Sequence, residues 1–363
     1  MRTWMAVVAV VSAGLATSAV VAIGPEPAAA GGNVVAFNNQ APQAVTLHDA
    51  ASGELLASVP TGVGPHELAV SPDGAVLVVS NYGQQKPGNT LTVMSMADLS
   101  SPRTIDLGDH LRPHGLAFLP DGKRVVVTSE MERCIVVVDL ATGAVEQRID
   151  TDQAGSHMVA LSPDGARAYV TNVGSGSLSV IDFASGTLVR TIPTASGAEG
   201  LAVSPDGRTV WVANNQGASL SVVDAEAMEV RHSLDCAGFP IRLAFTPDGK
   251  HVLAVLAFSG ELAVFDARTR ERTHTIDLRQ KDKPVPQEHP QLKDSPLPLS
   301  IWVSKDGARA LVSCKAANFV AVVDLERFVV TGRFDSPGAP DGVVETSVRT
   351  AEGEVEAGRM QEK

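Results

Sequence analysis

The chain alternates short apolar runs with the tight-turn phrase x-Pro-Asp-Gly, and this arrangement repeats six times between residues 66 and 307. The phrase first reads LAVSPDG at Leu68–Gly74 and last, in a degraded form, IWVSKDG at Ile301–Gly307. β-Branched residues with two-residue alternation on both sides of a Pro-Asp-Gly turn predict antiparallel strands. Successive turn aspartates are 42 to 58 residues apart, and they are Asp73, Asp121, Asp164, Asp206, Asp248 and Asp306.

Each repeat divides into four apolar runs, which we name strands A to D in chain order. Strand A ends at the Pro-Asp-Gly turn, and strand B follows, as in Val76–Asn81. Strand C ends in an aspartate, and a second tight turn such as Asp139–Gly143 leads to strand D. Four strands in a unit of about 40 residues are typical of a propeller blade rather than of a two-helix solenoid repeat.

The two ends of the chain supply the parts of one further blade. Val34–Asn38, Ala44–Asp49 and Glu54–Val59 read as strands B, C and D, and Ala339–Val344 reads as a strand A. Joining them closes the array and removes exposed sheet edges. We therefore expect an all-β, seven-bladed β-propeller over residues 31–349, with four antiparallel strands per blade and a closing blade shared by both termini. The polar residues 350–363 are expected to form a mobile tail.

Composition and the N-terminal residues indicate where the protein is located and which partners it lacks. The chain has 363 residues and a net charge of −12, with no basic stripe, which argues against nucleic-acid binding. Arg2, the apolar run Met5–Ile23 and the small residues Ala28–Ala30 are typical of a cleavable signal peptide over residues 1–30. We expect a periplasmic or secreted monomer that is not held in a membrane after cleavage. The odd set of three cysteines argues against a disulfide framework and favours ordinary strand residues: Cys134, Cys236 and Cys314.

The ends of the B strands carry a family resemblance. The sequence reads YVTN up to Asn172, VAN at residues 212–214 and VSN at residues 79–81, each in a repeat that also holds an SPDG turn. The chain thereby resembles the YVTN family of seven-bladed propellers, which is related to lactonase-like and cytochrome d1-type propellers. The resemblance implies the fold. It does not imply one activity, because these motifs are turn and strand chemistry shared by proteins of many functions.

The insertions indicate which face is functional. The A–B and C–D turns are short and uniform, whereas the B–C connection Gly83–Asn89 and the D–A segment Arg279–Leu297 are longer. Functional loops tend to vary on a rigid scaffold, so we place the site on the D–A/B–C face, where the axial channel opens. The proline-rich segment Arg279–Leu297, with His289 near its middle, is either a lid or a solvated excursion. A protein partner would also be expected on this face.

The position seven residues before each turn aspartate begins strand A, next to the axis. It holds His66, His114, His157, Glu199, Ile241 and Leu299, and the closing blade aligns Asp341 there. Neutral imidazoles suit Cu, Zn, Fe or Ni, and a carboxylate can complete the shell. We predict metal ligands at His66, His114, His157, Glu199 and Asp341. A metal-free polar pocket, or histidines that only bond loop backbone, would give the same pattern.

Neighbouring positions supply further polar candidates. Glu67, Arg242 and Ser300 follow the ring position, and the B–C connections begin with Asn38, Asn81, Glu130, Asn172, Asn214 and Lys315. We predict ligand or cofactor binding by Glu67, Asn81, Glu130 and Lys315. The resemblance to propeller lactonases implies acid–base roles for Glu199 and Arg242. The alternatives are an ion pair between Arg242 and Glu199, and asparagines that cap turns.

Several signatures are missing from the sequence, including C-x-x-C-H for covalent haem and G-x-S-x-G for a nucleophilic serine. We therefore expect a propeller that binds a small ligand or a transition metal at the channel mouth. One alternative is a periplasmic metalloenzyme or lactonase-like enzyme using the same residues. A second is an interaction scaffold accessory to a redox system. Whether the protein is an enzyme stays open.

Overall fold

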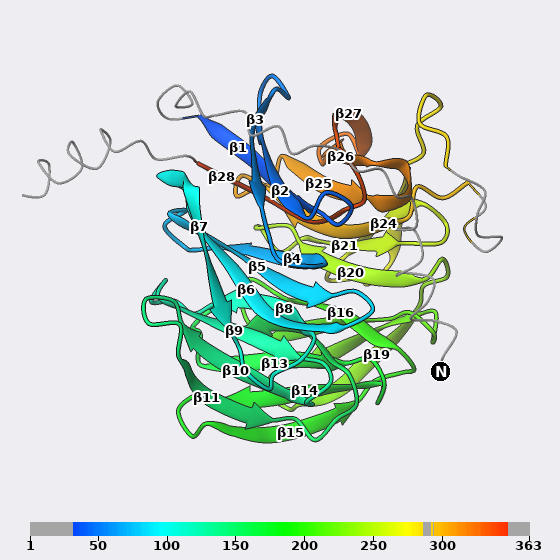
Figure 1. Cartoon of the computed structure of the whole chain (residues 1–363). Helices are drawn as coiled ribbons and strands as arrows, with labels where there is room; N and C mark the ends of the chain where they lie inside the picture. The colour runs from blue at the N-terminus through cyan, green and yellow to red at the C-terminus, as the bar shows by residue number, and fades with distance from the viewer. Residues whose placement is uncertain (1–31, 286–291, 293, 348–363) are drawn as a thin grey trace, which may run out of the picture.

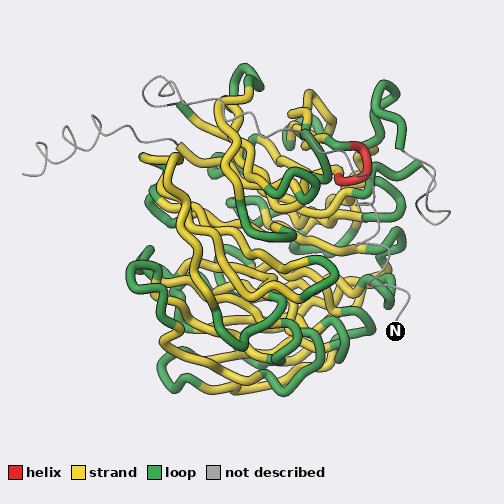
Figure 2. The backbone as a smooth tube through the Cα atoms, viewed as in Figure 1, coloured by secondary structure: helices red, strands yellow, loops and turns green. Residues whose placement is uncertain are grey.

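A computed structural model describes residues 32–285, 292 and 294–347, and it confirms the seven-bladed propeller. Seven four-stranded antiparallel sheets surround a central axis (Figure 1). The described backbone is almost entirely strand and turn (Figure 2), with one short 3₁₀ helix, η2, at Lys315–Ala317. No helix in this part of the chain is long and apolar enough to cross a membrane. The expected signal peptide and C-terminal tail lie outside the described residues.

Every blade has the same order of strands from the axis outward. The innermost strands are β4 (Pro65–Val70), β8 (Pro113–Phe118), β12 (Ser156–Leu161), β16 (Ala198–Val203), β20 (Pro240–Phe245), β24 (Pro298–Val303) and β28 (Pro340–Ser347). The second strands are β5 (Val76–Gly83), β9 (Arg124–Ser129), β13 (Arg167–Asn172), β17 (Thr209–Asn214), β21 (His251–Leu256), β25 (Arg309–Cys314) and β1 (Asn33–Asn39). Innermost strands of neighbouring blades contact one another around the axis.

The outer half of each blade is equally regular. The third strands are β6 (Pro87–Ser95), β10 (Cys134–Asp139), β14 (Ser177–Asp182), β18 (Ser219–Asp224), β22 (Glu261–Asp266), β26 (Phe319–Asp324) and β2 (Ala44–Asp49). The outermost strands are β7 (Asp98–Asp106), β11 (Val145–Asp150), β15 (Thr187–Pro193), β19 (Glu229–Asp235), β23 (Arg272–Asp277), β27 (Val329–Asp335) and β3 (Leu55–Pro60).

The repeated turn phrase has a local physical cause. In the first repeat, the Ser71 hydroxyl donates to Asp73 Oδ1 at 2.5 Å, and the same oxygen accepts the backbone N–H of Ala75 at 3.0 Å. Gly74 has a φ of 77°, a left-handed conformation that glycine adopts without strain. Each Pro-Asp-Gly turn therefore reverses the chain between strands A and B without help from other blades.

The closing blade forms as the sequence predicts. Strand β28 pairs with β1, with Val34 opposite Thr346 and Ala36 opposite Val344. Because the two strands come from opposite ends of the described chain, this pairing closes the ring of blades.

The two insertions that the sequence predicts, Gly83–Asn89 and Arg279–Leu297, are paired or anchored to the propeller where the structure describes them. Gly83 pairs with Pro87, so the expected B–C loop is largely a hairpin extension of β5 and β6. The D–A segment is anchored on both sides: Asp282 forms an ion pair with Arg333 on the outermost strand β27, and the Ser295 hydroxyl donates to the Ala257 carbonyl. His289 lies outside the described residues, and the lid stays a prediction.

The hydrophobic core lies between the blades rather than at the axis. In the largest cluster, Leu253 and Val255 of one blade pack with Val312 and Phe319 of the next. Cys134, Cys236 and Cys314 are buried and free, and burial raises the pKa of each thiol. They are packing residues, in agreement with the sequence. Because apolar residues hold the blades together, the polar residues at the axis are not needed for the core.

Candidate metal centre

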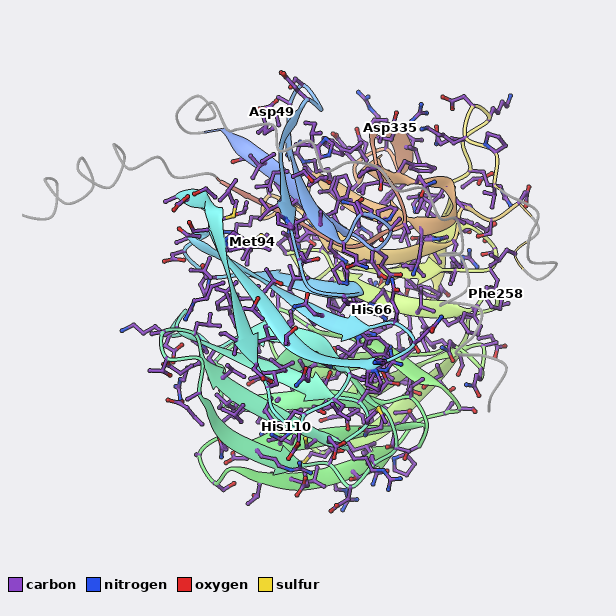
Figure 3. All side chains as sticks on the ribbon, in the orientation of Figure 1. Asp49, His66, Met94, His110, Phe258 and Asp335 are labelled. Atoms are coloured by element: carbon purple, nitrogen blue, oxygen red, sulfur yellow. The ribbon has the colours of Figure 1, made fainter. Side chains whose placement is uncertain are left out.

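The three ring-position histidines lie in one row at the axis. His66, His114 and His157 begin the innermost strands β4, β8 and β12 of three consecutive blades. The ring centroids of His66 and His114 are 4.2 Å apart, and those of His114 and His157 are 3.8 Å apart. His114 is only 1% exposed. Figure 3 places His66 near the middle of the molecule, away from Asp49 and Asp335 at its rim.

A β-bulge directs these side chains into the channel. In the first blade, Pro65 pairs with Asn81 and Leu68 with Val79, so that two residues, His66 and Glu67, oppose one. The corresponding interruption occurs in the blades of His114 and His157. A bulge breaks the alternation of a strand and re-aims its side chains. Positions 66 and 67 can therefore both contribute to the same cluster.

Carboxylates stand at both ends of the histidine row. His157 Nε2 lies 2.8 Å from Glu199 Oε1, and His66 Nδ1 lies 3.5 Å from Asp341 Oδ2. Asp341 also accepts the amide of Gln40 at 2.7 Å and lies 3.6 Å from the Lys315 ammonium. The structure thus brings all five predicted metal ligands into one continuous row.

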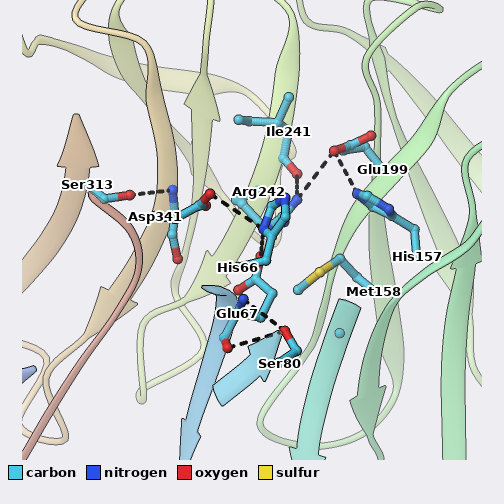
Figure 4. A network of polar contacts seen from close by, with 12 residues as sticks. His66, Glu67, Ser80, His157, Met158, Glu199, Ile241, Arg242, Ser313 and Asp341 are labelled. Atoms are coloured by element: carbon cyan, nitrogen blue, oxygen red, sulfur yellow. Dashed lines mark hydrogen bonds and ion pairs between the residues drawn. The ribbon is translucent and has the colours of Figure 1, made fainter. Parts of the chain in front are cut away.

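Arg242 lies beside His66 and connects Glu67 with Glu199 (Figure 4). Its Nη2 donates to Glu67 Oε1, and its Nη1 lies 3.6 Å from Glu199 Oε1. The side chains of Arg242 and Glu67 are 10% and 8% exposed. The ion pair with Glu199 that the sequence left as an alternative is present, but Glu67 is the closer partner.

A second set of residues near the channel lies nine positions after the turn aspartates, and the sequence prediction includes only two of its polar members, Glu130 and Lys315. The residue nine positions after each turn aspartate is Tyr82, Glu130, Val173, Asn215, Ala257 or Lys315. The Tyr82 hydroxyl donates to Glu130 Oε2 at 2.8 Å, and the Asn215 amide donates to Glu199 Oε2 at 3.0 Å. The asparagine one position earlier in the first blade, Asn81, bonds Thr90 and Thr92 of its own blade and accepts the N–H of Gly62 in the connection from the closing blade. A constant offset from the turn would have identified Tyr82 and Asn215.

Tyr82 closes the outer side of the row. Its ring meets those of His66 and His114 edge-on, at centroid distances of 5.2 and 5.4 Å. The Arg112 guanidinium covers the Tyr82 ring at 4.5 Å, a cation–π contact. Burial and the neighbouring Glu130 carboxylate raise the pKa of Tyr82, so the phenol keeps its proton and acts as a hydrogen-bond donor.

The three histidines have different charge states. Burial lowers the pKa of His66, and burial together with the neighbouring histidines holds the pKa of His114 well below its ordinary value. Burial also opposes the charged form of His157, but Glu199 and Glu130 outweigh it and raise the pKa of His157 to about 9. Burial would raise the pKa of Glu199, but His157 outweighs it and lowers that pKa to about 2. Two neutral imidazoles therefore stand beside one imidazolium paired with a carboxylate.

Buried nitrogen atoms in the row lack hydrogen-bond partners among the described residues. They are the Nδ1 atoms of His66, His114 and His157. Glu199 engages Nε2 of His157, and Nδ1 of the same imidazolium lies 3.7 Å from Glu130 Oε2. A metal ion that bound this Nδ1 would displace its proton. Two overlapping groups have all ligand atoms within 4.8 Å of one another: His66, Glu67 and His114, and His114, Glu130 and His157. This donor set fits a borderline metal ion.

A hollow on the opposite face of the propeller is a weaker candidate. It is lined by residues of the Pro-Asp-Gly turns, among them Ser162, Asp164 and Arg167. Asp164 Oδ1 already accepts the Ser162 hydroxyl and the Ala166 N–H. Because its acidic side chains serve their own turns, we place the functional site at the histidine row.

Comparisons with known proteins agree with the fold. The sequence model of the YNCE-like beta-propeller family matches residues 123–286. Hydrazine synthase from Kuenenia stuttgartiensis is a structural neighbour with a TM-score of 0.64 and 18% identity, covering 79% of this chain and 96% of its own. A functionally unknown protein from Desulfotomaculum acetoxidans has a TM-score of 0.68 and 14% identity, covering 88% and 99%. No curated protein sequence matches. At these identities the neighbours show the fold alone, and the resemblance to YVTN-type propellers is confirmed at that level.

Proposed function

We propose that this propeller binds one divalent transition-metal ion at the mouth of its axial channel, with His66, His114 and His157 as the central donors. The observation that carries the proposal is the set of buried Nδ1 atoms without hydrogen-bond partners. Leaving a buried polar atom unsatisfied costs about 1–3 kcal/mol. The Nδ1 atoms of His66 and His157 have only carboxylate oxygens at 3.5 and 3.7 Å, beyond good hydrogen-bond distance, and a bound ion would satisfy all three atoms.

The charge of the cluster supports a divalent ion. Four carboxylates face three cations, Arg242, Lys315 and the His157 imidazolium, within one network of contacts; the carboxylates are Glu67, Glu130, Glu199 and Asp341. The metal-free network therefore has an excess of one carboxylate. A metal ion that bound His157 would displace its proton and raise this excess to two, which a divalent cation would neutralise in a place where water screens charge poorly.

The chemistry of the donors narrows the choice of metal. Imidazole nitrogen favours Zn, Cu, Fe or Ni, whereas Mg and Ca prefer sites made of oxygen. In such a site Glu199 would hold the Nε2 side of His157 and so orient Nδ1, as carboxylates behind metal-bound histidines commonly do.

The charge states of Glu199 and Arg242 support a role in metal binding rather than the acid–base catalysis that the sequence resemblance implies for them. His157 lowers the pKa of Glu199 to about 2, although burial opposes the shift. Burial opposes the charged form of Arg242, but Glu67 and Glu199 raise its pKa. Neither group exchanges a proton readily near neutral pH, as a general acid or base must.

The test is the metal content of protein purified without a tag. We expect about one equivalent of Zn, Cu, Fe or Ni in the native protein, since both donor groups share His114 and therefore form one metal site. The double variant His114→Ala/His157→Ala should contain none. His232→Ala, at an exposed position on β19, is the matched control and should keep the metal. Metal-free native protein that also fails to take up any of these ions would overturn the proposal.

A further inference from the structure

We infer that Arg242 determines which of the two overlapping donor groups holds the ion: it occupies Glu67, so that Glu130 is the carboxylate ligand beside His114 and His157. This inference rests on the proposed metal site and assigns roles within it. The composition of the two groups does not decide which carboxylate binds the ion, because both groups contain His114 and each offers one carboxylate. The neighbours of Glu67 and Glu130 decide it.

Glu67 is already neutralised by a cation that cannot move away easily. The Arg242 guanidinium bonds Glu67 through Nη2, donates through Nη1 to the Ile241 carbonyl at 3.0 Å and lies 3.6 Å from Glu199. Both Glu67 and Arg242 are nearly buried. A metal ion that took Glu67 would have to leave a buried guanidinium without its closest partner, which is strongly unfavourable.

The only cation that faces Glu130 among the described residues is the His157 imidazolium, whose proton a metal ion can displace, unlike the guanidinium of Arg242. Among the described residues, no arginine or lysine forms an ion pair with Glu130. Its Oε2 accepts a neutral hydrogen bond from Tyr82 at 2.8 Å and lies 3.7 Å from His157 Nδ1. The hydroxyl fixes the orientation of the carboxylate and leaves its charge available. Tyr82 is thus a positioning residue for this donor group.

The orientation of His157 also favours Glu130 as the ligand. Glu199 holds Nε2 of His157, so Nδ1 faces Glu130 rather than Glu67. The group His114, Glu130 and His157 is buried and oriented before any ion arrives. The group His66, Glu67 and His114 becomes available only when Arg242 is removed. Because both groups share His114, Arg242 directs a single ion to the Glu130 group.

The decisive measurement is a Zn²⁺ titration of metal-stripped, full-length protein by calorimetry, with Glu130→Gln and Glu67→Gln as a matched pair. Loss of a supporting or ligating carboxylate commonly lowers metal affinity by about 10–100-fold. We expect that full loss for Glu130→Gln and a clearly smaller loss for Glu67→Gln, which removes no ligand but leaves the Arg242 charge without its closest partner near the ion. Equal losses in the two variants, or a loss only in Glu67→Gln, would overturn the inference.

The Arg242→Met background provides a second, independent readout. There Glu67 is released next to His66, so Glu130→Gln should lower Zn²⁺ affinity far less than it does in the native protein. Lys250→Met, which replaces an exposed lysine paired with Asp248, is the control background, and Glu130→Gln should keep its full effect there. An undiminished effect of Glu130→Gln in Arg242→Met contradicts the inference. A native protein that binds no Zn²⁺ or other transition ion overturns the proposed function itself, so the two failures are distinguishable.

Discussion

Glu67 and Arg242 form a buried ion pair although they lie 175 positions apart in the sequence, on the innermost strands of blades that are not neighbours. The pair lies beside His66 at the centre of the polar network (Figure 4). It ties the first complete blade to the fifth, so its effect on stability is separate from that of the apolar contacts between adjacent blades.

Removal of one partner of this pair should destabilise the protein strongly. Breaking a buried ion pair from one side costs about 3–5 kcal/mol, because the other charge stays buried without compensation. We expect this cost for Arg242→Met, measured by urea unfolding of the metal-free protein. The double variant Glu67→Met/Arg242→Met should recover most of it, and a double variant as unstable as the single one would contradict this account.

The ion pair between His157 and Glu199 makes stability depend on pH in a defined direction. Burial opposes its charge, but Glu199 and Glu130 raise the pKa of His157 from 6.5 to about 9, so its stabilising contribution is complete below pH 6.5 and is lost as pH rises through 9. Against the opposing effect of burial, His157 lowers the pKa of Glu199 from 4.5 to about 2, so that contribution is present above pH 4.5 and is lost as pH falls through 2.

The pair should therefore stabilise the metal-free protein most between pH 4.5 and 6.5. The difference in melting temperature between the native protein and His157→Phe should be largest in this window and should shrink above pH 9. A difference that stays constant from pH 6 to pH 10 would show that His157 contributes only packing.

A bound ion should stabilise the folded protein by mass action. At a free Zn²⁺ concentration about 100 times the dissociation constant, the expected gain is about 2.7 kcal/mol. The melting temperature should rise on addition of Zn²⁺ and return to its starting value with a chelator. His114→Ala should show no rise, because His114 belongs to both donor groups.

Gly115 should not tolerate a side chain, because its position brings β8 close to β12. A Cβ atom there would lie 2.8 Å from the carbonyl oxygen of His157 and 2.8 Å from the N–H nitrogen of Val159, and backbone atoms cannot rotate away. We expect Gly115→Ala to cost about 1–3 kcal/mol of stability and to weaken metal binding by displacing His114 and His157. Gly332→Ala, where the space is open, is the control and should change neither property. Equal unfolding curves for the two variants would contradict the prediction.

The role of the ring position was accessible from the sequence because the turn phrase repeats at a constant distance from it. His66, His114 and His157 all stand seven residues before a turn aspartate, and each blade places that residue at the same point. The same logic with an offset of nine would have identified Tyr82. The strand-end motif points to Asn81, one position earlier, but the Asn81 side chain bonds Thr90 and Thr92 of its own blade.

The amino-acid sequence by itself determined the number of blades, the closure by both termini and the row of histidines, because turn chemistry and strand alternation are local and repeat with the fold. Only the tertiary structure decided that Arg242 binds Glu67, that Tyr82 holds Glu130, and that Glu199 holds Nε2 of His157. These relationships depend on side chains that meet across the axis from separate blades. Their distances follow from closure of the whole ring and from the bulges beside it, and no local pattern in the chain encodes them.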